Sequence, residues 1–171
     1  EFLLDDETGD FFFLEVNTRL QVEHPVTEVI TGIDLVREQL KISSGEAISF
    51  TQKSLIPKGH AIEARLYAED PSKDFLPAVG EILAFSPPLE PSVRWDSGVE
   101  KNSFVGVEFD PMLAKVISHG EDRTEATLKL ATALEKLHLA GVTTNRDFLI
   151  STLRHKSFLE GETTTDFIET N

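Results

Sequence analysis

The first sixteen residues alternate between apolar runs and a polar turn. Residues 1–4 and 10–16 are rich in Phe, Leu and Val, and the stretch between them is acidic and contains a glycine. Aromatic and branched side chains favour strands, and a polar, glycine-containing stretch between two such runs is typical of a hairpin. The pattern therefore predicts two short strands joined by a turn at the amino end.

A helix is predicted after Asp34, because Asp is a favoured N-cap residue. Glycine tolerates the conformation that often ends a helix, so we expect this one to end near Gly45. Its apolar positions recur at helical spacing: Leu35, Val36, Leu40 and Ile42. Residues 46–58 are polar and close with a Pro-Lys pair, which indicates a connector and a domain boundary.

From residue 59 onward the pattern predicts strands first and helices afterwards. The predicted strands are 59–69, 80–86, 92–97 and 111–118. A helix is expected over 122–139, after the capping residue Asp122, and Asn145 is expected to cap a last helix. This order favours an α+β fold in which helices pack on a mostly antiparallel sheet.

Composition places the chain among globular proteins. It has 171 residues, of which 40% are hydrophobic and 27% charged, so it can bury a core without disulfides. A formal net charge of −14 argues against nucleic-acid partners and a polybasic membrane anchor. The absence of cysteine excludes disulfides, zinc–thiolate sites and thiol nucleophiles. Because the sequence begins with Glu1, we expect a piece of a longer chain, and no apolar run reaches the roughly 20 residues of a membrane helix.

The most informative stretch is EVNTRLQVEHP, at residues 15–25. Polar side chains occupy every odd position from 15 to 23, namely Glu15, Asn17, Arg19, Gln21 and Glu23. In an extended backbone they share one face. By spacing alone, this alternation favours a solvated strand face over a functional site.

The types of side chain suggest a more specific chemistry. Glu15 and Asn17 offer hard oxygen donors that suit Mg²⁺, and Glu1 on the neighbouring strand can share the metal. Arg19 carries a planar fork that matches a small oxyanion. Glu23 can then act as a base towards a substrate that Arg19 holds.

The order of residues from Glu15 to Glu28 closely resembles the signature of biotin carboxylases, which are ATP-grasp enzymes. The resemblance covers nearly the whole chain, since it continues through GHAIEAR at 59–65, VRWDSG at 93–98, DPMLAK at 110–115 and GVTTN at 141–145. It implies the tail of an ATP-grasp domain over residues 1–50. Residues 57–171 then correspond to the biotin carboxylase C-terminal domain, as in the α-chain of acyl-CoA carboxylases.

The resemblance also implies a reaction and its partners. In this family ATP and bicarbonate carboxylate biotin on a carrier protein, with Mg²⁺ or Mn²⁺ as cofactor. Most of the ATP site would lie outside these residues, so we expect them to be inactive alone. The implied partners are a biotin carboxyl carrier domain, a second copy in a homodimer and a carboxyltransferase subunit.

Individual roles follow from the same resemblance. It assigns metal binding to Glu1, Glu15 and Asn17. It assigns bicarbonate binding to Arg19, Gln21 and the backbone of Val22. Glu23 matches the base that deprotonates bicarbonate, and Arg94 matches an arginine that stabilises the enolate-like oxygen of deprotonated biotin.

Several alternatives stay open at the level of sequence. The second domain can act mainly as a dimerisation or interaction module, or the chain can belong to an ATP-grasp ligase with another substrate. Propionyl-, methylcrotonyl- and acetyl-CoA are candidate acceptors, and urea is a further one. We expect a cytoplasmic protein, or one of the mitochondrial matrix if the source is eukaryotic.

Overall fold

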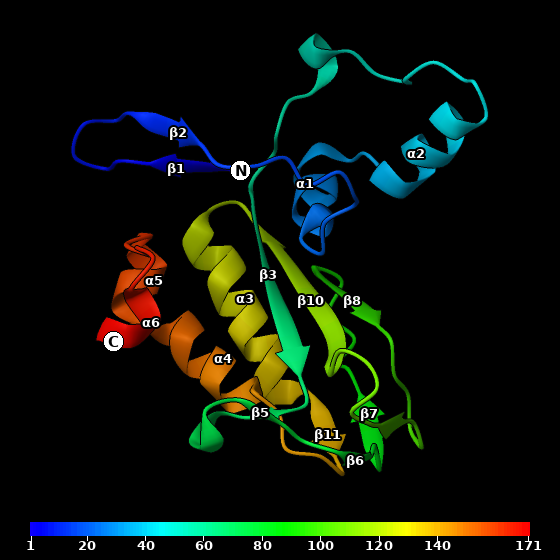
Figure 1. The fold of residues 1–171 in the computed structure, drawn as a ribbon, viewed down its shortest axis with the longest axis vertical. Helices are drawn as coiled ribbons and strands as arrows, with labels where there is room; N and C mark the ends of the chain where they lie inside the picture. The colour runs from blue at the N-terminus through cyan, green and yellow to red at the C-terminus, as the bar shows by residue number, and fades with distance from the viewer.

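The computed structural model describes all residues from 1 to 171. A hairpin of β1 (Phe2–Leu4) and β2 (Phe11–Phe13) is followed by the helices α1 (His24–Thr31) and α2 (Leu35–Ser43). A larger body begins at β3. In Figure 1 the hairpin and α2 extend from the top of this body, and α1 lies close to the upper end of its sheet.

The predicted hairpin is present, with a shorter second strand than expected. The two strands are antiparallel and pair Phe2 with Phe13. The side chain of Asp5 accepts from the backbone amides of Glu7 and Thr8, which closes the polar turn. The ladder ends near residue 14, because the chain then leaves β1 and runs towards α1 instead of continuing as a strand to residue 16.

Of the two helices that follow, the sequence predicted α2 and missed α1. Asp34 caps α2 as expected, since its side chain accepts from the amide of Arg37 at 2.8 Å. Helix α1 has Pro25 in its first turn and ends at Gly32, which is left-handed with φ of 74°. Both are ordinary helix-boundary signals, but the alternation before residue 24 suggested an extended chain.

The body contains a three-stranded antiparallel sheet in the order β3 (His60–Tyr67), β10 (Met112–Gly120) and β8 (Val93–Ser97). Three two-stranded antiparallel pairs surround it. They are β4 (Glu69–Asp70) with β5 (Leu76–Pro77), β6 (Gly80–Glu81) with β9 (Phe104–Val105), and β7 (Ala84–Ser86) with β11 (His138–Ala140). Short 3₁₀ turns lie at Gln52–Ser54 and Pro71–Lys73. The expected strands are therefore present, although 80–86 forms two strands that pair with different partners.

The helices of the body are α3 (Arg123–Lys136), α4 (Arg146–Arg154), α5 (Lys156–Glu160) and α6 (Phe167–Thr170). Helix α3 packs on one face of the sheet, where Ile62 and Val116 meet Leu130 and Leu134. Burial of these aliphatic side chains is the main stabilising contribution here. The expected α+β fold, with helices on a mostly antiparallel sheet, is confirmed.

Asn145 does not cap α4 through its side chain, contrary to expectation. Its Oδ1 accepts from the backbone amide of Tyr67 at 2.9 Å, and its Nδ2 donates to the carbonyl of Arg65 at 3.1 Å. These two bonds tie the start of α4 to the outer strand β3. Two further short helices follow α4, so it is not the last one.

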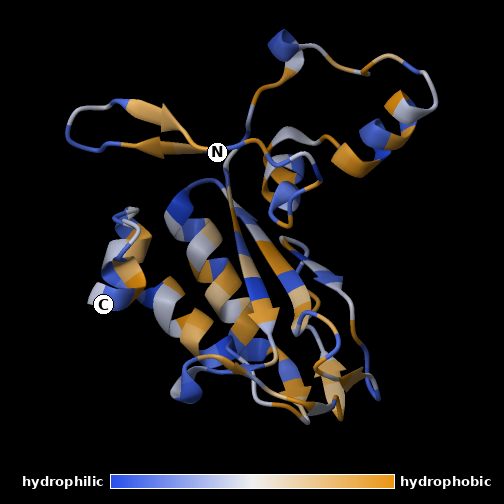
Figure 2. Cartoon of the chain, viewed as in Figure 1, coloured by the Kyte–Doolittle hydropathy of each residue, from blue (hydrophilic) through white to orange (hydrophobic).

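The two faces of the sheet differ in character, as the alternating colours of β3 and β10 in Figure 2 show. One face is apolar and is covered by α3. The other carries the charged side chains of Glu63, Arg65, Arg94, Asp96 and Lys115, and it faces α1 and the turn before it. None of the helices has the length and the apolar character that a membrane span requires.

Candidate functional site

The backbone of residues 15–23 is not the extended ribbon that the alternation predicted. No strand is formed between β2 and α1, and the chain turns at Val22 and Glu23 into α1. The amide of His24 donates to the carbonyl of Gln21 at 3.3 Å, which is a turn contact. Leu20, Gln21 and Val22 are consecutive and all half-buried, so the strict in-and-out alternation ends here.

The three predicted metal ligands nevertheless lie together. Nδ2 of Asn17 donates to Oε1 of Glu1 at 2.9 Å and to Oε1 of Glu15 at 3.1 Å. Two carboxylates thus converge on one amide group, and all three side chains are accessible. This set of hard oxygen donors fits Mg²⁺, which takes a few protein carboxylates and completes its shell with water and phosphate.

Arg19, Gln21 and Glu23 line one hollow of about 330 Å³. The hollow lies between the turn and the helices α1 and α2. Gln21 also donates to Oε1 of Glu1 at 3.3 Å, so it connects this hollow with the metal group. The structure therefore brings together the side chains proposed from residues 1–23, with Val22 supplying backbone between Gln21 and Glu23.

Glu23 has a partner that the sequence analysis did not select. Nη2 of Arg65, on β3, donates to Oε2 of Glu23 at 2.8 Å. Arg65 is a polar position of an alternating strand and lies within the GHAIEAR stretch, so the available signal was the resemblance itself. Only the packing of the turn against the sheet shows that Arg65 reaches Glu23.

Arg94 does not join this group, contrary to the placement that its assigned role requires. Its Nη1 donates to Glu28 at 2.7 Å, and its Nε and Nη2 donate to the two oxygens of Asp96, both at 2.8 Å. Bonds to Asp96 and then to Glu28 raise the pKa of the Arg94 guanidinium further above its usual value. It lines a different hollow, near Gly32 and Asp34 at the other end of α1.

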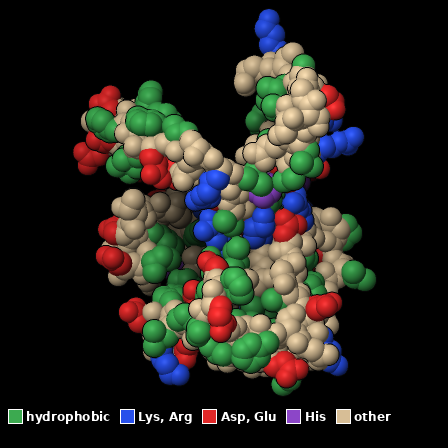
Figure 3. Space-filling model, turned by 45° about the vertical axis from the view of Figure 1, so that its right-hand side comes forward, with side chains coloured by type: hydrophobic (Ala, Val, Ile, Leu, Met, Phe, Trp, Pro, Cys, Tyr) green, Lys and Arg blue, Asp and Glu red, His purple; other side chains and the backbone are tan.

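Lys115, on the central strand β10, completes the polar face. Its Nζ donates to the backbone carbonyl of Val22 at 3.2 Å and lies 3.5 Å from Oδ2 of Asp96. Burial opposes ionisation of Asp96, but the hydrogen bonds and charges of Arg94 and Lys115 together outweigh it and lower the pKa of Asp96. In Figure 3 basic side chains gather at the waist of the molecule, between the upper elements and the body.

Glu63 is the least satisfied group on this face. Neither of its carboxylate oxygens is exposed or has a hydrogen-bond partner. Burial raises the pKa of Glu63 to about 7, against the opposing effect of Lys115 and Arg65 and with a smaller contribution from Glu23 and Asp96. The polar face thus contains a carboxyl group that is only partly ionised near neutral pH.

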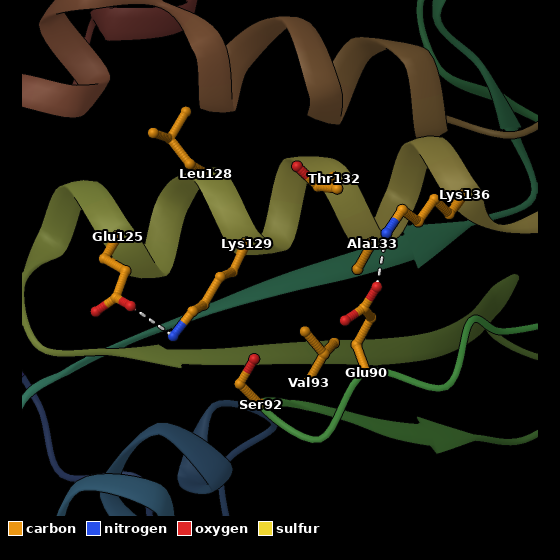
Figure 4. A pocket seen from close by; sticks show the side chains of 9 residues that line it. All are labelled: Glu90, Ser92, Val93, Glu125, Leu128, Lys129, Thr132, Ala133 and Lys136. Atoms are coloured by element: carbon orange, nitrogen blue, oxygen red, sulfur yellow. Dashed lines mark hydrogen bonds and ion pairs between the residues drawn. The ribbon is translucent and has the colours of Figure 1, made fainter.

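A further hollow lies along α3 and is drawn in Figure 4. It contains the ion pairs Lys129–Glu125 and Lys136–Glu90, at 2.8 and 2.7 Å. None of the predicted site residues lines it. The predicted site residues therefore lie outside this hollow.

Comparison with known families decides the identity of the fold. Residues 63–170 match the family described as the biotin carboxylase C-terminal domain. The chain belongs to this family. Residues 1–51 match the ATP-binding domain of the carbamoyl-phosphate synthase L chain, so the resemblance to biotin carboxylases seen in the sequence is confirmed.

Individual relatives agree with this family. The chain is 52% identical to biotin carboxylase 2 of Bacillus subtilis over 99% of its own length and 38% of the relative. It is 46% identical to the alpha subunit of the mitochondrial methylcrotonoyl-CoA carboxylase of Arabidopsis thaliana, over 99% of the chain and 23% of the relative. A pyruvate carboxylase subunit of Methanothermobacter thermautotrophicus is also 46% identical, over 99% of the chain and 34% of the relative.

A solved structure shares the whole fold. The biotin carboxylase domain dimer of Hydrogenobacter thermophilus 2-oxoglutarate carboxylase, in complex with MgADP and bicarbonate, is 36% identical with a TM-score of 0.96. The match covers 99% of this chain and 37% of that chain. The chain thus spans less than two fifths of the length of these biotin carboxylase relatives.

Proposed function

We propose that this chain supplies one side of the active site of a biotin carboxylase. The enzyme carboxylates biotin on a carrier protein at the expense of ATP and bicarbonate. One observation carries the proposal: Arg19, Gln21 and Glu23 line a single hollow, and Gln21 connects it to the carboxylates of Glu1 and Glu15. A solved relative was crystallised with MgADP and bicarbonate, which are the ligands that this donor set suits.

Glu1, Glu15 and Asn17 are the residues that would hold Mg²⁺ or Mn²⁺. When bound, the metal neutralises charge on the phosphoryl group that ATP transfers. Asn17 donates to both carboxylates, which keeps Glu1 and Glu15 beside each other, where they would supply oxygen ligands to such an ion. ATP and biotin are substrates, and residues beyond this chain would supply most of the ATP site.

Bicarbonate would lie in the hollow beside the turn. Arg19 and Gln21 present donors to its oxygens, and the backbone of Val22 supports them. Glu23 lines the same hollow and can take the bicarbonate proton. Because the anion is held next to its base, the two groups react without first having to meet in solution. The deprotonated oxygen can then attack the γ-phosphoryl group of ATP, which forms carboxyphosphate and releases ADP.

The biotin step needs a cation, because the ureido nitrogen of biotin is a very weak acid. A positive group at the ureido oxygen stabilises the charge that develops there. Arg65 meets this need better than Arg94, since it lies against Glu23 whereas the donors of Arg94 are bonded to Glu28 and Asp96. Arg65 therefore takes the role that the resemblance alone gave to Arg94, and Arg94 connects α1 with β8.

The chain divides into an ATP-grasp part over residues 1–50 and a C-terminal domain over 57–171. Two observations support this division. The family matches stop at residue 51 and resume at residue 63, and only a 3₁₀ turn interrupts the connector between α2 and β3. The relatives' names support a second copy in a homodimer, since one is a domain dimer, and a further subunit, since others are alpha subunits. In this proposal the further partners are a biotin carboxyl carrier domain and a carboxyltransferase subunit.

The acceptor of the carboxyl group is an acyl-CoA in this proposal. Similarity to subunits that act with methylcrotonoyl-CoA and propionyl-CoA supports it. A pyruvate carboxylase subunit is equally similar, which supports a separate carboxyltransferase as the part of the enzyme that selects the acceptor. The compartment follows the source, cytoplasm or mitochondrial matrix.

The proposed function is tested by ATP hydrolysis in the complete enzyme that contains this chain. We expect hydrolysis that depends on bicarbonate, rises with free biotin and falls about 100-fold in Glu23→Gln. A rate of ATP hydrolysis that changes with neither bicarbonate nor biotin would indicate an ATP-grasp ligase with another substrate. The 171 residues alone should show no biotin-dependent activity.

A further inference from the structure

Lys115 is an unusual residue for the centre of a sheet. It lies on the middle strand β10, and its side chain is only 14% exposed. Leu113 and Ile117, two positions away on either side, are almost fully buried. Removing an ammonium group from water costs several kcal/mol unless protein partners replace the water. The partners of Lys115 therefore indicate what the residue is for.

Stability alone does not account for these partners. Asp96 already receives two hydrogen bonds from Arg94, both at 2.8 Å, so it keeps hydrogen-bond partners without Lys115, although Arg94 is shared with Glu28. An apolar residue at such a position often stabilises a fold as well as a buried ion pair does. The contact that only Lys115 makes is the 3.2 Å bond to the carbonyl of Val22, 93 residues away in sequence.

Arg65, on the neighbouring strand, is a second cation that contacts the same turn as Lys115. In the register of β3 and β10, Arg65 lies directly opposite Lys115. Like charges at opposed positions destabilise an antiparallel pair. Here each cation binds a consecutive residue of the same turn: Arg65 binds the carboxylate of Glu23, and Lys115 binds the carbonyl of Val22. The two cations together fasten the turn to the sheet.

The turn has few other constraints on its main chain. The amide and the ring Nδ1 of His24 contact the carbonyl of Gln21, at 3.3 and 2.6 Å. The guanidinium of Arg19 donates only weakly, to the carbonyl of Leu20 at 3.4 Å and to Asn17 at 3.5 Å. Without Lys115 the carbonyl of Val22 would lose its side-chain hydrogen-bond partner. The donors of Arg19, Gln21 and the Val22 backbone would then no longer be held at fixed distances from one another.

We propose that Lys115 is a positioning residue for bicarbonate, which fixes the Val22 peptide so that Arg19, Gln21 and the Val22 backbone surround the anion. Its charge also makes the surroundings of Val22 more favourable to an anion. Lys115 acts through Val22 and does not itself touch the substrate. This inference rests on the proposed function, because it concerns the same bicarbonate site.

The test is a steady-state comparison of Lys115→Met with the wild type in the complete enzyme. Methionine keeps much of the apolar stem and removes the ammonium group. We expect the KM for bicarbonate to rise about tenfold, as the loss of one charged hydrogen bond predicts, while the KM for ATP and kcat at saturating bicarbonate stay within about twofold. Lys115→Arg should restore the bicarbonate KM to within about threefold, since arginine can still donate to Val22.

Lys129→Met is a matched control. Lys129 lies on α3, pairs with Glu125 at 2.8 Å and donates to the backbone carbonyl of His119 at 3.2 Å (Figure 4). It therefore has the same kinds of partner as Lys115 but lies on the opposite side of the sheet from the hollow. We expect its bicarbonate KM to equal that of the wild type.

Each outcome decides one point. An unchanged bicarbonate KM in Lys115→Met, or an equal change in Lys129→Met, overturns the role of Lys115. If Lys115→Met does not fold, Lys115→Gln replaces it, and a bicarbonate KM within about twofold of the wild type again overturns the role. A wild-type enzyme without bicarbonate-dependent ATP hydrolysis would refute the proposed function, whereas an active one with an insensitive Lys115 refutes only this inference.

Discussion

At the scale of single residues, the polar face of the sheet separates two arginines that the sequence cannot tell apart. Arg65 and Arg94 both occupy alternating positions on strands. Only Arg65 contacts Glu23, while Arg94 forms a three-bond network with Glu28 and Asp96. Their substitutions should therefore have different consequences.

Arg65→Met is expected to lower kcat for biotin carboxylation about 100-fold, because one oriented cation at a developing negative charge is worth that much. Arg94→Met should leave kcat within about fivefold and reduce the free energy of unfolding by about 1–2 kcal/mol, since its ion pairs are partly exposed. Kinetics and urea denaturation measure the two effects. Equal losses of activity in both variants would contradict the assignment of Arg65.

Glu63 provides a pH-dependent prediction at the same scale. Its pKa is raised from 4.5 to about 7, so the folded state disfavours the ionised form. The protein therefore loses stability as the pH rises from about 4.5 to about 7, and the loss is complete above that range. The neighbouring charges that oppose or add to this effect are Lys115, Arg65, Glu23 and Asp96.

Glu63→Gln should accordingly stabilise the protein at pH 8 by about 1–2 kcal/mol, since each pKa unit is worth about 1.4 kcal/mol and solvent screens part of the shift. At pH 4 the variant and the wild type should unfold at nearly the same urea concentration. Urea unfolding at the two pH values checks this. A variant that is less stable at pH 8 would show that the ionised carboxylate is favoured in the folded state.

At the scale of elements, α4 is fastened to the sheet by a side chain and not by a helix cap. Asn145 is buried and bonds two backbone groups of β3, at Tyr67 and Arg65. The carbonyl of Arg65 belongs to the same residue whose side chain reaches Glu23. The start of α4 therefore helps to fix the strand that carries Arg65.

Asn145→Ala should reduce the free energy of unfolding by about 2–3 kcal/mol, because it leaves a partly buried amide and a partly buried carbonyl without partners. Asp122→Ala is the comparison, since Asp122 is an N-cap residue whose side chain accepts from Glu125 at 2.8 Å. Loss of this exposed cap should cost only about 1 kcal/mol. Denaturant unfolding measures the loss of unfolding free energy in both variants. A smaller loss for Asn145→Ala than for Asp122→Ala would contradict the role of Asn145 in connecting α4 with β3.

At the scale of the whole molecule, the hydrophobic core and the candidate site lie in different parts of the chain. The buried hydrophobic core runs from Ala61 to Phe167. The hairpin, whose strands are coloured hydrophobic in Figure 2, instead exposes its aromatic side chains. Phe2, Phe11, Phe12 and Phe13 are each at least 58% exposed. The site therefore depends on a segment that is not itself part of the core.

This separation predicts that residues 57–171 fold without residues 1–56. The shortened chain should unfold cooperatively and keep its helical circular dichroism, because it retains both buried clusters. Thermal unfolding followed by circular dichroism measures this. A broad, non-cooperative transition would show that α1 is needed to complete the body and would contradict the proposed division of the chain.

Much of the fold could be predicted from local patterns. The cap at Asp34, the helix after Asp122 and the alternating strands 60–67 and 112–120 were each evident, because spacing and end signals within about ten residues define them. Helix α1 was missed because its polar approach has the alternation of a strand. The small strand pairs were harder, since each has only two or three residues and needs a distant partner.

The sequence by itself determined the family, the α+β fold and the set of side chains near residues 15–23, because a specific order of residue types is a local property. Only the tertiary structure decided which arginine meets Glu23 and which cation holds Val22. Those contacts join residues 42 and 93 positions apart in the chain. They depend on how the turn before α1 packs on the register of β3 and β10, and no local pattern specifies that packing.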